Sequence, residues 1–101
     1  MIKHIVMWTL KDSAEGADKA ANGAKMKAML EALPGLIPVI RELEVSTDVF
    51  AAAPGPCDII LYSTFDSRAD LDTYQVHPEH QKVVAFVKQV VASRAMVDYE
   101  I

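Results

Sequence analysis

The alternation of apolar and polar residues along the chain predicts four β-strands. Two of them, residues 2–10 and 57–65, carry apolar side chains on both faces, whereas residues 38–49 and 94–101 each have one charged face. A strand that is apolar on both faces belongs inside a sheet, and a charged face is typical of a sheet edge. The pattern therefore places residues 2–10 and 57–65 in the centre and the other two strands at the edges.

A helical periodicity separates the first two strands. Asp12, with Glu15 three residues later, is a candidate capping box, and Ser13 is a rival cap. The helix that they open is expected to run to about Leu33, because the Pro-Gly pair at residues 34–35 ends it.

A second helical region follows the third strand. Ser67 is expected to cap a short helix that contains Leu71 and Tyr74, with Asp70 completing the cap. Pro78 lies where a further helical segment begins, the position at which a helix tolerates proline best. An apolar stripe then recurs at helical spacing: Val83, Phe86, Val87, Val90 and Val91.

The order of the elements is β-α-β-β-α-β, which predicts an α+β, ferredoxin-like fold with a four-stranded antiparallel sheet in one domain over residues 1–101. Two helices cover only one face of a four-stranded sheet. The other face, which carries either Ile5 and Met7 or their neighbours of opposite parity, is then left open. Of the 101 residues, 51% are hydrophobic, which is high for so small a chain. We therefore expect a homodimer that packs through the open sheet face.

Charge and composition exclude several classes of protein. Ten basic and fourteen acidic residues give a net charge of −4, with no basic block to bind nucleic acid. The apolar runs are far too short to span a membrane, and residues 1–8 do not resemble a secretory signal. The lone Cys57 has no disulfide partner and is expected to be a packed thiol. These observations predict a cytoplasmic protein that binds neither nucleic acid nor a membrane.

The polar residues that can carry chemistry concentrate in the segment Tyr-Gln-Val-His-Pro-Glu-His at residues 74–80. Two histidines with Glu79 between them invite a metal site. However, His77 and His80 lack the spacing that places two imidazoles on one helical face, and no third ligand is near them in the sequence. We expect no metal ion and no cofactor.

An acid–base role for His80 agrees better with its place in the chain. In the first turn of a helix, the helix dipole disfavours a protonated imidazole, and a neutral imidazole is what a general base needs. The alternative is structural: His77 caps the helix, His80 makes a local hydrogen bond, and Tyr74 and His4 are core residues.

Four segments of the chain resemble the stress-responsive A/B-barrel (Dabb) family. They are residues 1–6 (Met-Ile-Lys-His-Ile-Val), 65–67 (Phe-Asp-Ser), 74–80 and 97–100 (Val-Asp-Tyr-Glu). The resemblance covers essentially the whole chain, and the Tyr-x-x-His-Pro-x-His segment is its most specific part. It implies ferredoxin-like protomers that pair into a dimeric α/β barrel.

The resemblance also implies a site between the sheet and the helices. In a plant member of the family that cyclises a linear polyketide without a cofactor, the catalytic His and Tyr match His80 and Tyr74, and a pocket His matches His4. A further pocket His of that enzyme is replaced here by Ile59, which makes the pocket more apolar. The residues expected to line the ligand pocket are Trp8, Ile59, Leu61, Leu71 and His77.

Three functions remain open at this point. The first is cofactor-free acid–base chemistry, similar to that of a cyclase, on a small carbonyl compound in an apolar cavity. The second is a non-enzymatic stress-response or ligand-binding protein that takes a small apolar molecule. The third is a cofactor-free, monooxygenase-like activity, as in other proteins of the dimeric α/β-barrel group.

Overall fold

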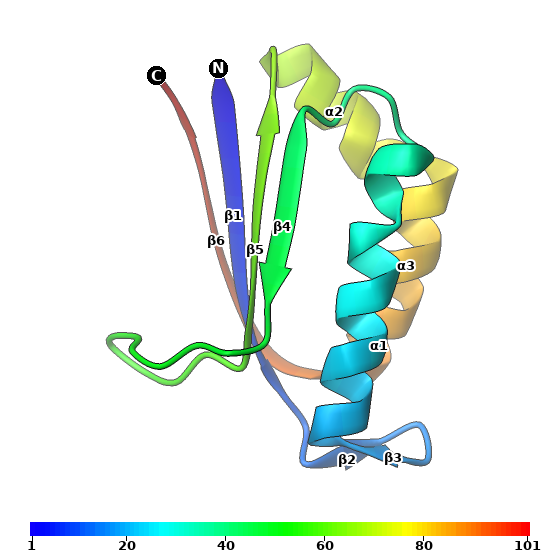
Figure 1. The fold of residues 1–101 in the computed structure, drawn as a ribbon, viewed down its shortest axis with the longest axis vertical. Helices are drawn as coiled ribbons and strands as arrows, with labels where there is room; N and C mark the ends of the chain where they lie inside the picture. The colour runs from blue at the N-terminus through cyan, green and yellow to red at the C-terminus, as the bar shows by residue number, and fades with distance from the viewer.

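A four-stranded antiparallel sheet forms one layer of the protein, whose computed structural model describes all 101 residues (Figure 1). Its strands are β1 (Ile2–Leu10), β4 (Glu42–Ser46), β5 (Ile59–Phe65) and β6 (Val91–Glu100). The strand order is β4-β5-β1-β6. The predicted ferredoxin-like fold is confirmed, with the two doubly apolar strands in the centre.

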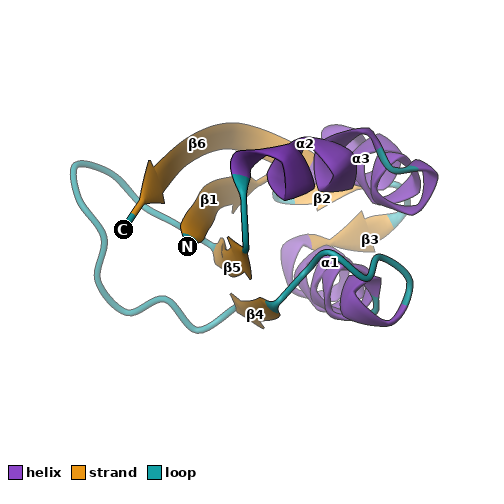
Figure 2. Cartoon of the chain, turned by 90° about the horizontal axis from the view of Figure 1, so that it is seen from above, coloured by secondary structure: helices purple, strands orange, loops and turns teal.

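The helices form a second layer on one face of the sheet (Figures 1 and 2). They are α1 (Lys19–Glu31), the 3-10 turn η1 (Leu33–Gly35), α2 (Arg68–Val76) and α3 (Pro78–Val90). The opposite face of the sheet carries no helix. No helix is both long and apolar enough to cross a membrane.

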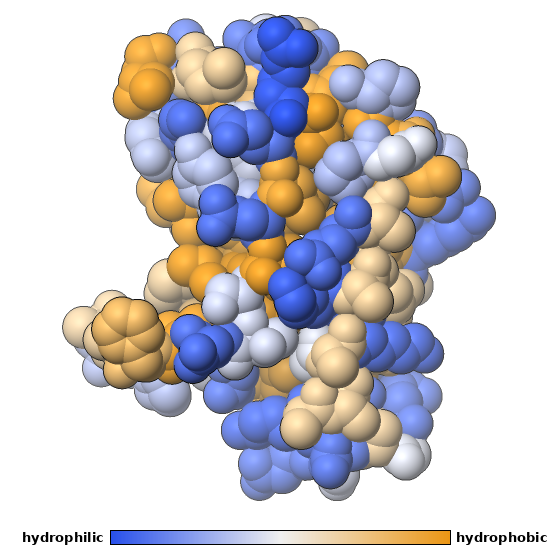
Figure 3. Space-filling view, viewed as in Figure 1, coloured by the Kyte–Doolittle hydropathy of each residue, from blue (hydrophilic) through white to orange (hydrophobic).

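The core lies between these two layers and follows the alternation of β1. The inward side chains of β1 are all buried: Ile2, His4, Val6, Trp8 and Leu10. The outward ones, Lys3, Ile5, Met7 and Thr9, are half-buried. In Figure 3, hydrophobic residues are visible between the sheet and α1.

A short hairpin, which the sequence pattern did not predict, precedes the first helix. Its strands are β2 (Ser13–Ala14) and β3 (Ala17–Asp18). The two residues between them, Glu15 and Gly16, both have positive φ angles, +51° and +74°. Two consecutive positive φ angles are typical of the tight two-residue turns of β-hairpins.

The predicted start of the first helix after Asp12 is therefore wrong. α1 begins at Lys19, and its cap is Asp18, whose side chain accepts a hydrogen bond of 2.8 Å from the backbone N–H of Ala21. Asn22 links the hairpin to the helix, because its side-chain amide donates a hydrogen bond of 2.9 Å to the carbonyl of Ala14.

The strand limits also differ from those predicted. β4 is shorter at both ends than residues 38–49. At its start, Pro38 has no N–H to donate, and the Ile40 N–H is used in a turn to the Ile37 carbonyl. β5 begins at Ile59 rather than residue 57, and β6 begins at Val91 rather than residue 94.

The two helix starts in the second half of the chain agree with prediction. The Ser67 side chain accepts a hydrogen bond of 3.1 Å from the Asp70 N–H and caps α2. Pro78 is the first residue of α3, where its missing N–H has no intrahelical partner to lose.

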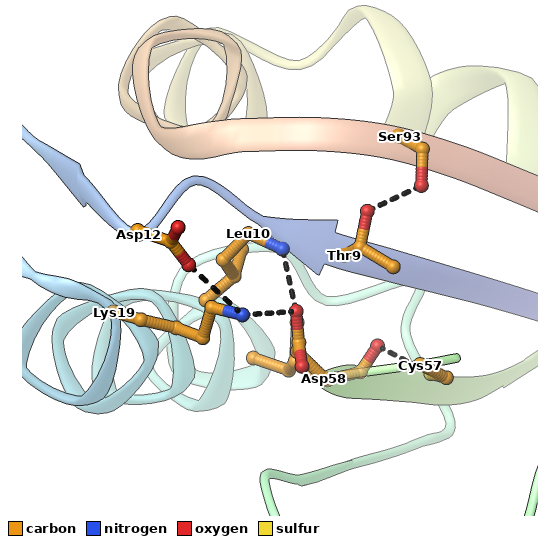
Figure 4. A network of polar contacts seen from close by, with 8 residues as sticks. Thr9, Leu10, Asp12, Lys19, Cys57, Asp58 and Ser93 are labelled. Carbon is orange, nitrogen blue, oxygen red and sulfur yellow. Dashed lines mark hydrogen bonds and ion pairs between the residues drawn. The ribbon is translucent and has the colours of Figure 1, made fainter.

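Asp58 ties the end of β1 to the start of α1 (Figure 4). The register of β1 against β6 shifts between Thr9 and Leu10, and the Asp58 carboxylate accepts a hydrogen bond of 2.8 Å from the Leu10 N–H. The Lys19 ammonium lies 3.5 Å from the same carboxylate and 3.6 Å from that of Asp12. One partly buried carboxylate thus links the end of the central strand to the first residue of α1.

Gly23 offers a test of how α1 packs on the sheet. A Cβ at Gly23 would lie 3.5 Å from Leu10 Cδ1 and 3.8 Å from Thr47 Cγ2, which are ordinary contacts. Because glycine weakens a helix interior, we expect Gly23→Ala to raise the free energy of unfolding by about 0.5–1 kcal/mol in urea titrations. Gly16→Ala is the control and should lower it, since Gly16 has a φ of +74°. A loss of stability in Gly23→Ala would contradict this packing.

Candidate functional site

A cavity of about 440 Å³ lies between the inner face of the sheet and helices α2 and α3. Its size falls within the usual range of ligand pockets. Its walls are mostly apolar and come from β1, β5, β6, α1 and α3: Val6, Trp8, Leu30, Leu61, Val83, Val84, Val87 and Val91. Its polar side chains are His4, Tyr74, Gln75, His80, Lys88 and Arg94.

Tyr74 contributes a hydroxyl group that has no partner. The residue lies in the last turn of α2, is 0% exposed, and its buried hydroxyl makes no hydrogen bond within the protein. Burial raises the pKa of the phenol well above its ordinary value, so the hydroxyl stays protonated at neutral pH. Tyr74 therefore holds a hydrogen-bond donor ready for a group in the cavity.

His80 presents a free imidazole nitrogen. It lies in the first turn of α3, and its Nδ1 is 3.1 Å from the Gln75 carbonyl oxygen. A carbonyl oxygen can only accept, so Nδ1 carries the proton, and Nε2 keeps its lone pair when the ring is neutral. His80 is thus fixed in the tautomer that can take a proton at Nε2.

The charge state of His80 follows from its surroundings. Burial lowers the pKa of the imidazole most, the hydrogen bond to Gln75 opposes this, and electrostatic interactions with His4, Arg94 and His77 lower the pKa further. The net shift is downward, so His80 is neutral at neutral pH.

His4 completes a row of three rings. It is buried on β1, and its Nδ1 contacts the carboxylate of Asp98 on β6, the residue opposite it in the strand register. The Tyr74 ring centroid lies 6.1 Å from that of His4 and 4.2 Å from that of His80. The structure therefore brings together the three residues that the sequence singled out for chemistry.

The predicted pocket residues divide into two groups. Trp8 and Leu61 line the cavity, whereas Ile59, Leu71 and His77 lie outside its lining. Ile59 is fully buried in the core. Leu71 borders a separate hollow near the start of β1.

His77 serves the local structure instead of the cavity. It is the N-cap of α3, and its Nδ1 accepts a hydrogen bond of 3.1 Å from the Glu79 N–H. The ring therefore points to the helix start, as the structural alternative for this residue expects. No group of three or more His, Cys, Asp or Glu side chains is arranged to hold a metal ion.

Three polar residues of the cavity were missed by the sequence analysis: Gln75, Lys88 and Arg94. Arg94 lies opposite Trp8 in the β1–β6 register and so belongs to the inner face of the sheet. The alternation of residues 94–101 places Arg94 and Asp98 on one face. Because that face pairs with His4 and Trp8, the sequence could have indicated that Arg94 lies on the cavity side.

Comparisons with known proteins agree with this architecture. The model of the stress responsive A/B barrel domain, Dabb, matches residues 2–101. A dimeric protein of unknown function and ferredoxin-like fold from Bacteroides fragilis NCTC 9343 is 37% identical, with a TM-score of 0.84 over 99% of this chain and 95% of that one. The hydroxynitrile lyase from Passiflora edulis has the same fold at 18% identity, with a TM-score of 0.82 over 99% of this chain and 92% of that one.

A curated relative is longer than this chain. A stress-response A/B barrel domain-containing protein of Arabidopsis thaliana is 29% identical over 86 residues, which are 83% of this chain. The chain spans 30% of the length of that relative. With a family model that matches residues 2–101, the chain belongs to the Dabb family of stress responsive A/B barrel domains.

Proposed function

We propose that the cavity binds a small apolar carbonyl compound and that His80 and Tyr74 catalyse the transfer of a proton from the carbon beside the carbonyl, without a cofactor. The observation that carries this proposal is the buried Tyr74 hydroxyl, which has no partner in the protein and shares the cavity with His80. A native protein rarely leaves such a group unpaired, because it costs about 1–3 kcal/mol. A ligand oxygen would satisfy it.

The chemical step follows from the states of the two side chains. The Nε2 lone pair of His80 takes the proton, and the electron pair of the broken C–H bond moves into the carbonyl to form an enolate. The Tyr74 O–H donates a hydrogen bond to the enolate oxygen, where the negative charge develops. The enolate carbon can then attack a second carbonyl carbon, and the alkoxide formed takes the proton back from His80.

His4 has a positioning role in this scheme. Its contact with the Asp98 carboxylate, which can only accept, places the proton on Nδ1 and fixes the ring orientation. Its ring meets Tyr74 edge-on, with an interplanar angle of 67°. His4 and Phe65, whose ring centroid is 5.1 Å from that of Tyr74, hold the phenol in place.

A second candidate function is ligand binding without catalysis. It is favoured by the local contacts of the two helix-start histidines, since His77 caps α3 and His80 bonds to the Gln75 carbonyl. In this case His80 only fixes the junction of α2 and α3. The exchange experiment below separates the two functions.

We also propose that two protomers pair through the bare face of the sheet. That face has a shallow apolar hollow of about 210 Å³ formed by Ile5, Met7, Ala95, Met96 and Val97. Val97 and Tyr99, which pair with the outward residues Ile5 and Lys3, are 51% and 44% exposed, and solvent-exposed apolar surface of this kind marks interfaces. The similar protein from Bacteroides fragilis is dimeric, which supports a dimer here.

The first prediction concerns catalysis. In D₂O, the protein should accelerate exchange of the α-protons of a medium-chain methyl ketone, followed by NMR. His80→Gln and Tyr74→Phe should each reduce this acceleration by about 100-fold or more, since they remove the base and the oxygen donor. Tyr74→Phe should leave the free energy of unfolding unchanged or higher, because it deletes an unpaired buried hydroxyl.

The matched control for this experiment is His77→Asn. Asparagine is a good N-cap, so the helix start is kept while a neighbouring imidazole is removed. Its exchange rate should equal that of the wild-type protein. Exchange that survives in His80→Gln would assign the cavity to binding alone.

The second prediction concerns pH. The ring of His80 should titrate by NMR below the ordinary value of 6.5, because burial disfavours its charged form. The base is active when neutral, so exchange should be lost as the pH falls through that midpoint. The folded state binds this proton less readily than the unfolded state does. The free energy of unfolding is therefore highest above pH 6.5 and decreases as the pH falls toward the lower pKa of the folded state. This decrease in stability should be absent from His80→Gln. A titration midpoint of His80 above 6.5 would contradict the buried site.

The third prediction concerns assembly. Size-exclusion chromatography with light scattering should give about twice the 11.1 kDa of one chain. Val97→Asp places a charge on the apolar face and should give the monomer. Leu36→Asp is the control, since Leu36 is equally exposed, at 50%, but follows η1 in the helix layer. A monomeric wild-type protein, or a dimeric Val97→Asp, would refute the proposed interface.

A further inference from the structure

The charged residues that line the cavity are all basic, although the chain as a whole is acidic. The net charge is −4, with fourteen acidic residues. Nevertheless, the residues that line the cavity include Lys88 and Arg94 and no Asp or Glu. A cavity meant for a neutral molecule alone has no need of such an asymmetry.

The partners of the basic residues make the asymmetry sharper. Of the ten lysines and arginines, eight have a partner within the protein. Five form ion pairs: Lys19, Lys27, Arg41, Arg68 and Lys82. Three make other contacts: Lys3 with the Tyr62 hydroxyl, Lys11 with the Gln89 carbonyl and Lys25 with the Phe86 ring. The two that remain, Lys88 and Arg94, are the two that line the cavity.

These two cations reach the cavity from different elements. Lys88 lies in the last turn of α3, and Arg94 lies on the inner face of β6, opposite Trp8. The charge of Arg94 acts on groups within the cavity, because it contributes to lowering the pKa of His80. Both residues are exposed and also line the cavity, so their charged groups lie where the apolar cavity meets solvent.

From this arrangement we infer that the ligand is an amphipathic carboxylate, with an apolar body inside the cavity and its carboxylate held at the mouth by Lys88 and Arg94. Arginine binds a carboxylate through two parallel hydrogen bonds, and lysine adds a further charge-assisted one. The carboxylate site does not depend on the proposed function. Only the placement of a second group does: if the ligand also has a carbonyl in its chain, that carbonyl would lie at Tyr74 and His80.

Binding can be measured without knowledge of the natural ligand. Trp8 is the single tryptophan of the chain and lines the cavity, so its fluorescence reports occupancy. The probes are octanoate and octanol, which have the same apolar chain and differ in charge. We expect octanoate to bind the wild-type protein at least tenfold more tightly than octanol, and its affinity to fall as salt is added.

The variants then assign the charge. Arg94→Met and Lys88→Met keep most of the apolar stem, and each should weaken octanoate binding about fivefold or more while leaving octanol binding unchanged. Lys82→Met is the control, since it removes a charge from the same helix at a residue paired with Glu79. It should change neither affinity. Melting curves of all three variants confirm that they are folded.

Several outcomes would overturn the inference. They are equal binding of octanoate and octanol, no binding of either by fluorescence and calorimetry, or an Arg94→Met, Lys88→Met double variant that keeps the preference. Tighter binding of octyl phosphate than of octanoate would show that the anionic group is a phosphate instead.

The inference and the proposed function can fail separately. A charge-dependent preference for octanoate in a protein that exchanges no α-protons would keep the carboxylate site and reject the catalytic role. Exchange of a neutral ketone with no preference for octanoate would keep the catalytic role and reject the carboxylate site.

Discussion

The register of β1 between its two neighbours is the constraint on which the rest of the structure depends. Because side chains alternate, this register turns His4 and Trp8 toward the helices and Ile5 toward the bare face, and a slip of one residue would exchange the two sets. The same pairing brings Asp98 to the His4 ring and lets the Ser63 hydroxyl donate to the His4 carbonyl at 3.3 Å. One strand thus orders the cavity on one side and exposes apolar surface on the other.

The cavity contains features that work against stability. The Tyr74 hydroxyl and the Trp8 indole N–H are both buried without partners, each at a cost of about 1–3 kcal/mol. Ring contacts with Phe65, His4 and His80 hold Tyr74 where it is. Unpaired donors fixed by good packing are expected of a preformed binding site, because a core selected for stability alone would use phenylalanine here.

Sequence patterns predicted the features that local chemistry decides, and missed those that depend on tertiary partners. Strand alternation and the helix starts at Ser67 and Pro78 follow from nearby residues, so the topology could be predicted. The hairpin was missed because Glu15 lies three residues after Asp12 and imitates a capping box, while its positive φ leaves no trace in the sequence. Arg94 was missed because its position on the inner face depends on the pairing of β6 with β1, and its lack of a partner is seen only in the folded chain.

The charge at the mouth of the cavity and the neutral state of His80 belong to one electrostatic field. Burial is the largest cause of the lowered pKa of His80, and the charge of Arg94 adds to it. A carboxylate bound to Arg94 offsets that charge, so it raises the proton affinity of His80 while burial keeps the ring neutral at neutral pH. Linkage requires the reverse as well: a proton on His80 tightens the hold on the carboxylate. The two cations would then select the ligand, and the bound carboxylate would make His80 a stronger base.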